Sequence, residues 1–480
     1  MDDRNKVTIC SITKDTPFKN KAIEENISSP NGPSLEQKMH AMPWLAAQSP
    51  FHTFFGLLTI FGTVFVLFLD ELNLDKTKIG FLLSLIPFCG IISLFVAPWV
   101  AKIGTKRIFL VFYYLRSFAA VLLLLTPFLL SISPFSAFIW IATTISIIAI
   151  CRSIAETALW SWQQEFIPDS IRGRMSAVTS NLAALAGIVS VGFASYMLKH
   201  NASLGIFMIL IFIGSVAGVI STSCFLFIPG GHPDHHRGEN STHLDGIIGA
   251  FRDKNFILFL VVLGVALIGV ALPMYFVPLF LKQKVAMPID KIILLEISTN
   301  LGAFLSVFFW GWASDRYGSK PIMLTSLWCL LSIPILWAVF PRHYNSACII
   351  LAIMIVFFYG IGSVGWMTGW CRYLFTGAMP AEKKTAYTSV FYAWISVTGG
   401  FAPLINGWLA DMTAGVDGRY GLVIVDSYTL LFILCFLCFL LCLVLVFFVR
   451  ADSSYTMLKF LKSLIIGEPI IALLKRLRRT

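Results

Sequence analysis

The sequence predicts an all-α polytopic membrane protein with twelve transmembrane helices in two pseudo-symmetric six-helix halves. Composition, the length of the apolar runs and an internal repeat support this fold class. The 480-residue chain is 57% apolar and only 13% charged, and its mean hydropathy is +0.81. Soluble domains carry roughly 25% charged residues. The charge needed to cover a soluble surface is therefore missing.

The apolar residues occur in long runs separated by short polar breaks. A run of about 20 apolar residues spans a bilayer as a helix, and the runs lack the alternation of a membrane barrel. The predicted helices lie near residues 51–70, 78–100, 107–131, 135–162, 175–198, 203–229, 255–281, 288–313, 321–340, 346–374, 386–411 and 427–449.

Polar segments divide the helices into regions. The first forty residues are polar and lack an apolar stretch, so we expect no cleaved signal peptide and a disordered cytoplasmic tail over residues 1–44. A polar, His-rich cytoplasmic linker, 230–254, separates the halves 45–229 and 255–450. Apolar and basic residues mix in 451–480, which predicts an amphipathic tail at the membrane surface.

The distribution of basic residues predicts the orientation of the chain. With both termini in the cytoplasm, the cytoplasmic segments hold 26 Lys or Arg residues and the outer segments hold 8. This bias is the one that cytoplasmic loops show. The loop "LKQKVAMPIDK" runs against it, because it places three lysines outside. Asp70 and Glu71 end the first helix at the outer surface, where we expect them to be solvated.

A short polar phrase repeats in corresponding places of the two halves. "GWASDRYGSKP" occupies 311–321, and a weaker copy, "APWVAKIGTKR", occupies 97–107. Gly104 and Gly318 are 214 residues apart, each after the second helix of its half. Further landmarks repeat at an offset of 212, namely Pro168 with Pro380 and Gly187 with Gly399. The six-helix unit is therefore duplicated.

These features resemble the major facilitator superfamily, in which a G-x-x-x-D-R-x-G-x-K phrase joins helices 2 and 3 of a half. The resemblance covers about residues 45–450, and "ALWSWQQEFIPDSIRGR" is similar to a group of bacterial members. The first copy departs from the pattern, because Ala97 and Ala101 replace the family's Gly and Asp. The matching positions are Gly311, Asp315, Arg316, Gly318 and Lys320 in the second half and Gly104, Lys106 and Arg107 in the first.

We expect the phrase to act as a cytoplasmic gate latch. Gly311 would allow neighbouring backbones to approach closely, and Gly318 would allow a tight turn. Asp315 would face a helix N-terminus of its own half, while Arg316 and Lys320 would hold the loop at anionic lipid. The alternative is a basic loop that only sets topology.

Ionisable side chains within the spans are candidates for the substrate and coupling site. Arg152 and Glu156 are four residues apart on one helix, so they share a face and can pair. The resemblance places this helix at a central cavity, but a structural ion pair is the alternative. Glu296, with Asn300 one turn further in, is a candidate proton carrier. The alternative is a structural role, in which the carboxyl hydrogen-bonds to a neighbouring helix or is hydrated from the outer side.

Helix 346–374 also carries an aromatic face formed by Tyr359, Trp366, Trp370 and Tyr373. Such a face suits stacking on a sugar or another ring, and a buried core stripe is the alternative. We identify no nucleotide-binding P-loop, catalytic motif or metal-ligand spacing, so we expect no cofactor, no metal and no enzyme activity.

The predicted function is secondary active transport of a small solute by alternating access, coupled to protons or another ion. A sugar-like molecule or an organic anion is the expected substrate class. A transporter-fold receptor or membrane assembly factor is the alternative function. We expect a monomer in the lipid bilayer, in the inner cell membrane if the source is bacterial, with no nucleic-acid partner.

Overall fold

The computed structural model describes residues 33–167, 171–199, 202–233, 248–380, 384–416, 418–420, 423–453 and 455–465. Within these residues, twelve helices are long and apolar enough to cross a membrane, which confirms the predicted number. Residues 234–247 of the linker and 466–480 of the C-terminal tail lie outside the described part of the chain.

The first half contains six spans, several of them built from two or three helical segments. Breaks occur where glycine or proline interrupts regular hydrogen bonding, as at Gly62 between the two parts of the first span. Its elements are α2 (Leu35–Thr59), α3 (Thr63–Glu71), α4 (Lys76–Phe88), η1 (Cys89–Ile92), α5 (Ser93–Ile103), α6 (Thr105–Val121), η2 (Leu122–Leu125), α7 (Thr126–Ile132), α8 (Pro134–Phe166), α9 (Arg172–Leu198), α10 (Leu204–Cys224) and η3 (Phe225–Phe227).

The second half repeats this arrangement. Its elements are α12 (Lys254–Ala271), η4 (Leu272–Phe276), α13 (Val277–Gln283), α14 (Ile289–Tyr317), α15 (Ser319–Ala338), α16 (Ser346–Tyr373), η5 (Leu374–Ala378), α17 (Lys384–Met412), α18 (Thr429–Phe448) and α19 (Met457–Ile465). Strands β1 (Gly418–Tyr420) and β2 (Val423–Val425) pair antiparallel in the loop before α18, with Arg419 opposite Ile424. The membrane-spanning part is all-α, as predicted.

The first helix begins at Leu35, ten residues before the expected start of the first half at 45. Ser34 accepts a hydrogen bond from the Gln37 backbone, and the Gln37 side chain accepts one from the Ser34 backbone. This capping box starts the helix. Met42 and Leu45 are then buried with residues of the first half. Residues 35–44 therefore belong to the folded half and not to the tail.

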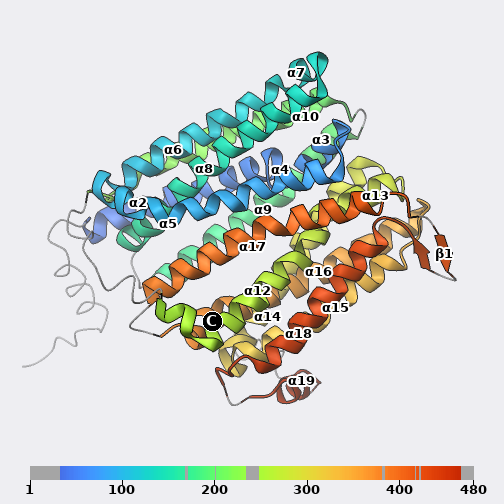
Figure 1. The fold of residues 1–480 in the computed structure, drawn as a ribbon. Coiled ribbons are helices and arrows are strands. Elements are labelled where there is room, and N and C mark those ends of the chain that lie inside the picture. The colour runs from blue at the N-terminus through green and yellow to red at the C-terminus, as the bar shows by residue number, and fades with distance from the viewer. Residues whose placement is uncertain are drawn as a thin grey trace, which may run out of the picture.

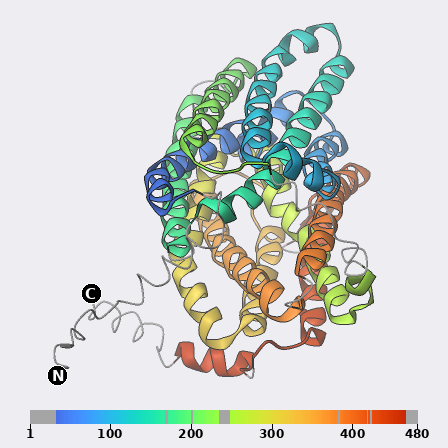
Figure 2. The same ribbon diagram turned by 90° about the vertical axis from the view of Figure 1, so that its left-hand side faces the viewer.

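The two halves lie side by side, with the spans running in the same general direction (Figure 1). Helix α4 packs on α17, where a side chain at Gly80 would come within 2.4 Å of the Pro403 carbonyl oxygen. Helices α9 and α14 make a second contact, in which the Ser195 hydroxyl donates to the Asp290 carbonyl at 3.0 Å. In Figure 2 the blue-to-green first half lies mostly in the upper part of the view and the yellow-to-red second half mostly in the lower part.

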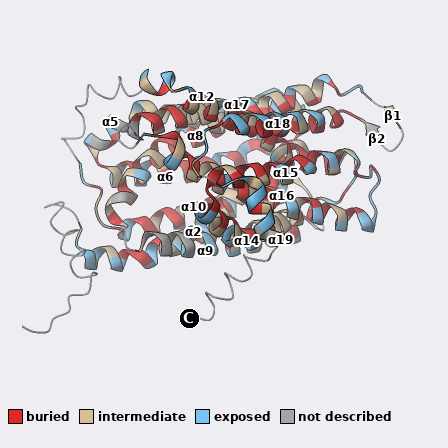
Figure 3. Cartoon of the chain, turned by 90° about the horizontal axis from the view of Figure 1, so that it is seen from below, coloured by how far each residue is buried: buried red, intermediate tan, exposed pale blue. Residues whose placement is uncertain are grey.

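Buried positions recur along the helices of both halves (Figure 3). Large apolar side chains are nonetheless exposed, among them Phe95, Phe128, Phe308 and Phe448. A soluble protein rarely leaves so much aromatic surface uncovered. This outer surface suits contact with lipid tails.

Candidate functional site

An ion pair lies inside the fourth span, on α8. Arg152 Nε donates to Glu156 Oε1 at 2.6 Å, so the four-residue spacing brings the two side chains together. The side chains are 31% and 34% exposed, which places the pair beside open space and not in a closed core. The guanidinium carbon also lies 4.5 Å from the centroid of the Phe61 ring. A functional role for the pair stays a prediction.

Glu296 on α14 joins the two halves. Its Oε1 accepts hydrogen bonds from the Thr63 backbone N–H at 2.7 Å and from the Thr63 hydroxyl at 2.5 Å. Thr63 is the first residue of α3, where free N–H groups favour an acceptor. The second carboxyl oxygen, Oε2, is sealed from solvent and has no hydrogen-bond partner among the described residues. The carboxyl is thus half satisfied, by a donor that belongs to the opposite half.

A cavity of about 230 Å³ lies beside Glu296. Most of its wall is apolar or aromatic, and Asn300 and Thr299 add polar groups next to the carboxyl. Both halves contribute to the lining, which is formed by Leu57, Phe61, Thr63, Pro273, Met274, Val277, Pro278, Leu281, Ile292, Leu295, Glu296, Thr299, Asn300, Trp337, Val356 and Tyr359. Phe61 links the cavity to Arg152, because its ring lies against that guanidinium.

Trp366 lies elsewhere. It is 6% exposed and belongs to a buried apolar core that contains residues of both halves. Neighbouring glycines bring α16 close to other helices, since a side chain at Gly365 would reach Trp310 at 2.6 Å. Tyr359, one residue of the predicted aromatic face, does line the cavity. Within the described residues, the aromatic face is therefore divided between the core and the cavity.

The repeated phrase forms the same turn in both halves. Gly104 has φ +107° and ψ 128°, and Gly318 has φ +86° and ψ 178°. These conformations are reached almost exclusively by glycine. Each glycine ends one helix and starts the next, so the expected role of Gly318 in a tight turn is what the structure shows.

The lysines of the phrase bind the end of the last helix in their half. Lys106 Nζ donates to the carbonyls of Leu226 at 2.9 Å and Ile228 at 2.6 Å. Lys320 Nζ donates in the same way to Phe447 at 2.7 Å and Val449 at 2.8 Å. The last carbonyls of a helix have no intrahelical donor, so each lysine satisfies them. This corrects the expectation that Lys320 reaches toward lipid headgroups.

Two further parts of the phrase differ from expectation. A Cβ on Gly311 would meet nothing within 4 Å, so this glycine does not serve a close backbone contact. Asp315 is 87% exposed and lies 3.8 Å from Arg372 Nη1 at the end of α16. We expected Asp315 to face a helix N-terminus of its own half. At the N-terminus of α15 it is Asp452 that accepts a hydrogen bond, from the Ser319 backbone N–H at 2.8 Å.

Arg316 and Arg107 complete the phrase. The Arg316 guanidinium carbon lies 5.7 Å from the centroid of the Tyr317 ring and 5.9 Å from that of Trp312. Arg107 is exposed on the first turn of α6. A gating role for these residues is a prediction that the geometry alone does not test.

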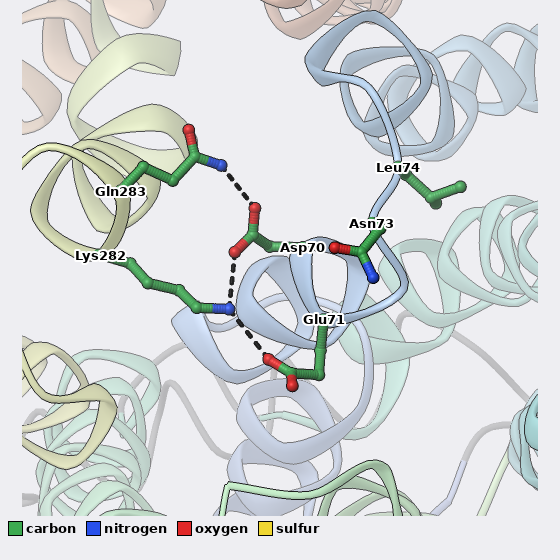
Figure 4. A pocket seen from close by; sticks show the side chains of 6 residues that line it. All are labelled: Asp70, Glu71, Asn73, Leu74, Lys282 and Gln283. Carbon is green, nitrogen blue, oxygen red and sulfur yellow. Dashed lines mark hydrogen bonds and ion pairs between the residues drawn. The ribbon is translucent and has the colours of Figure 1, made fainter. Parts of the chain in front are cut away.

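A polar network joins the halves at the face predicted to be outer. Lys282 Nζ lies 2.7 Å from Asp70 and 3.0 Å from Glu71, and Gln283 donates to Asp70 at 2.6 Å (Figure 4). We expected Asp70 and Glu71 to be solvated. The structure instead pairs both with Lys282 of the other half. The lysine-rich loop that departs from the predicted orientation was the sequence signal for this network. Part of its charge has partners in the other half.

A second cross-half contact extends the network. Asp411 on α17 accepts from the backbone N–H groups of Lys76 at 3.2 Å and Thr77 at 2.6 Å, at the start of α4. A carboxylate at a helix N-terminus is favourable. Lys76 Nζ in turn lies 4.4 Å from the centroid of the Tyr428 ring. The sequence offered no signal for this pairing, because 334 residues separate Thr77 from Asp411.

Comparison with protein families gives a match over almost all of the described chain. A family model described as Major Facilitator Superfamily matches residues 51–297 and, again, residues 256–479. The second match begins within α12 at the start of the second half, and the first match extends from the first half into α14. No curated protein matches the sequence.

Solved transporters share the fold at low sequence identity. The structure of the nucleoside transporter NupG is 14% identical, with a TM-score of 0.61, and the match covers 87% of this chain and 100% of that one. The inward-open xylose transporter XylE from E. coli is 13% identical, with a TM-score of 0.63 and coverages of 89% and 99%. An inward-facing bacterial homologue of the human lysosomal transporter Spinster is 12% identical, with a TM-score of 0.63 and coverages of 87% and 97%.

Proposed function

Because this chain belongs to the Major Facilitator Superfamily and is a membrane transporter, we propose that it moves a small solute by alternating access, driven by protons that Glu296 carries. The coupling ion and the assignment of Glu296 are the new parts of this proposal. They rest on the position of one carboxyl group between the two halves.

The Glu296–Thr63 contact is the observation that carries the proposal. Its donors belong to the first half and its acceptor to the second. Separation of the halves at the Glu296–Thr63 contact would remove both hydrogen bonds and admit water to the Glu296 carboxyl. A group whose surroundings differ between two conformations binds its proton differently in each. The same movement that exposes the cavity therefore changes the proton affinity of Glu296.

Arg152 and Glu156 supply the polar part of the proposed solute site. Their pair borders open space and reaches the cavity through Phe61. A bound organic anion would have to compete with Glu156 for the guanidinium, whereas a sugar-like solute could hydrogen-bond to both side chains together. Two of the similar structures are a nucleoside transporter and a xylose transporter. We therefore favour a sugar-like solute over an organic anion.

Proton movement in liposomes tests the proposal. Purified protein would be reconstituted with a pH-sensitive dye inside, and nucleosides, pentoses and organic anions would be added in turn. We expect one class to start proton movement in the wild type. The Glu296→Gln variant, which keeps the shape of the side chain but cannot ionise, should bind the same solute and move no protons.

Asp75→Asn is the matched control, because Asp75 pairs only with Lys78 of its own helix end in the described structure and its side chain is 64% exposed. It should move protons at the wild-type rate. Proton movement by Glu296→Gln equal to that of the wild type would exclude Glu296 as the carrier. Solute exchange without proton movement in the wild type would retain transport and reject proton coupling.

A further inference from the structure

Helix α19 packs against the body of the second half through one aromatic side chain. Phe460 is fully buried. Its ring centroid lies 5.2 Å from that of Tyr317 and 6.2 Å from that of Phe309, both on α14. A nine-residue helix is too short to be stable alone, so this contact holds it in place.

The chain just before α19 binds both sides of the Gly318 turn. Asp452 accepts from Ser319 N at 2.8 Å through Oδ2 and at 3.0 Å through Oδ1. The Ser453 hydroxyl donates to the Tyr317 carbonyl at 2.6 Å. A Cβ on Gly318 would lie 2.4 Å from the Ser453 oxygen, so the fit depends on glycine. We call Asp452, Ser453 and Phe460 the C-terminal clamp.

The opposite face of α19 is basic and apolar. Leu458 is 70% exposed, and Lys459 and Lys462 are exposed beside it. At 100° per residue, these three positions form one continuous face that points away from Phe460. The last turn has no acidic residue. This face has the composition of helices that lie in the lipid headgroup layer.

The position of α19 matches that layer. The span α14 ends at Tyr317, α15 begins at Ser319 and α18 ends at Phe448, so three spans reach the membrane boundary beside it. Figure 1 shows α19 at this end of α14, α15 and α18. Arg450, exposed between α18 and the clamp, adds another positive charge.

We propose that the Leu458–Lys459–Lys462 face of α19 binds an anionic phospholipid leaflet, and that the C-terminal clamp transmits this binding to the Gly318 turn. Lysines near an anionic lipid surface are attracted to it. Lipid binding keeps α19 at the membrane surface. This position keeps Asp452 and Ser453 bound to Ser319 and Tyr317, the two residues that flank Gly318. The inference does not depend on the proposed solute or on proton coupling.

Hydrogen exchange of the full chain in vesicles tests the proposal. The protein would be reconstituted in phosphatidylcholine alone and in phosphatidylcholine with phosphatidylglycerol. In the anionic vesicles we expect exchange in α19 to slow roughly tenfold. Exchange of the Ser319 and Lys320 backbone amides, which donate hydrogen bonds to Asp452, should slow as well. High salt should reverse both effects, because it screens surface charge.

Two variants separate lipid binding from packing. Lys459→Gln with Lys462→Gln should abolish the effect of phosphatidylglycerol while leaving exchange in phosphatidylcholine unchanged. Lys38→Gln with Lys102→Gln removes the same charge from the first half, at the same face, and should keep the effect. Phe460→Ala should speed exchange in α19 and at Ser319 in both lipids.

Two results would overturn the inference. In one, α19 exchanges equally fast in the two kinds of vesicle. In the other, the Lys459–Lys462 double variant still responds to phosphatidylglycerol. Slowing of α19 without slowing at Ser319 and Lys320 would retain the lipid contact and reject its transmission to the turn.

Discussion

Single residues decide how buried charge is tolerated in this protein. Arg342, in the loop after α15, donates through Nε to Asp426 at 2.9 Å, and its side chain is 7% exposed. Burial lowers the pKa of Arg342, and the Asp426 carboxylate opposes that shift. Asp426 also accepts from the backbone N–H groups of Tyr428 and Thr429 at the start of α18. The Asp426 carboxylate thus pairs with a buried guanidinium and also accepts hydrogen bonds from the start of α18.

Asp426→Asn should destabilise the protein by about 3–5 kcal/mol, the usual effect of leaving a buried charge without its partner. The reason is that Arg342 would stay charged in a site with little water. Thermal unfolding in detergent, followed by tryptophan fluorescence, measures the loss. Lys78→Gln, which breaks the exposed pair with Asp75, should change stability by less than about 1 kcal/mol. Equal effects of the two changes would contradict this account of burial.

At the level of elements, the helix-to-helix turns explain why the polar phrase occurs twice. Each copy places a glycine with positive φ between two spans and a lysine on the last carbonyls of its half. The first copy does this without an Asp at position 101. The retained Gly and Lys positions are therefore the ones that the turn itself requires, and the Asp belongs to another role.

The two glycines of the second copy should respond differently to alanine. Gly318→Ala should destabilise by about 1–3 kcal/mol, because its backbone conformation excludes a side chain and Ser453 fills the space. Gly311→Ala should be neutral or stabilise by roughly 0.5–1 kcal/mol, since Gly311 lies inside a helix with open space around it. Thermal unfolding of both variants measures the difference. Similar losses would show that Gly311 has a neighbour in another conformation.

For the whole molecule, contact between the halves concentrates polar pairs at the face predicted to be outer. Lys282 with Asp70 and Glu71, Asp411 with the start of α4, and Glu296 with Thr63 all connect one half to the other. The described polar contacts at the Gly104 and Gly318 turns stay within one half. The described polar contacts therefore hold the halves together at the face predicted to be outer.

Lys282→Gln should therefore shift the population toward an outward-open state. It removes two ion pairs that exist in the closed arrangement and leaves each half intact. Spin labels placed on α3 and α13 would report the distance between the halves at this face. We expect a larger fraction of long distances than in the wild type. Lys78→Gln, whose partner Asp75 lies in the same half, is the control and should leave the distribution unchanged.

The sequence by itself determined the features that depend on local composition. The number of spans, the duplicated half and the positions of Gly104 and Gly318 follow from apolar length and from a repeated phrase. The Arg152–Glu156 pair was predictable for the same reason, because four residues bring two side chains together on any helix. The early start of α2 at Leu35 was missed, although its capping box is a local signal.

Only the tertiary structure decided which distant groups meet. Thr63 and Glu296 are 233 residues apart, Lys282 and Glu71 are 211 apart, and Ser319 and Asp452 are 133 apart. Hydropathy places each of these side chains near a membrane depth but not on a particular side of its helix. Their pairing depends on how the spans rotate and pack, and that is set by the combined close contacts of many helices.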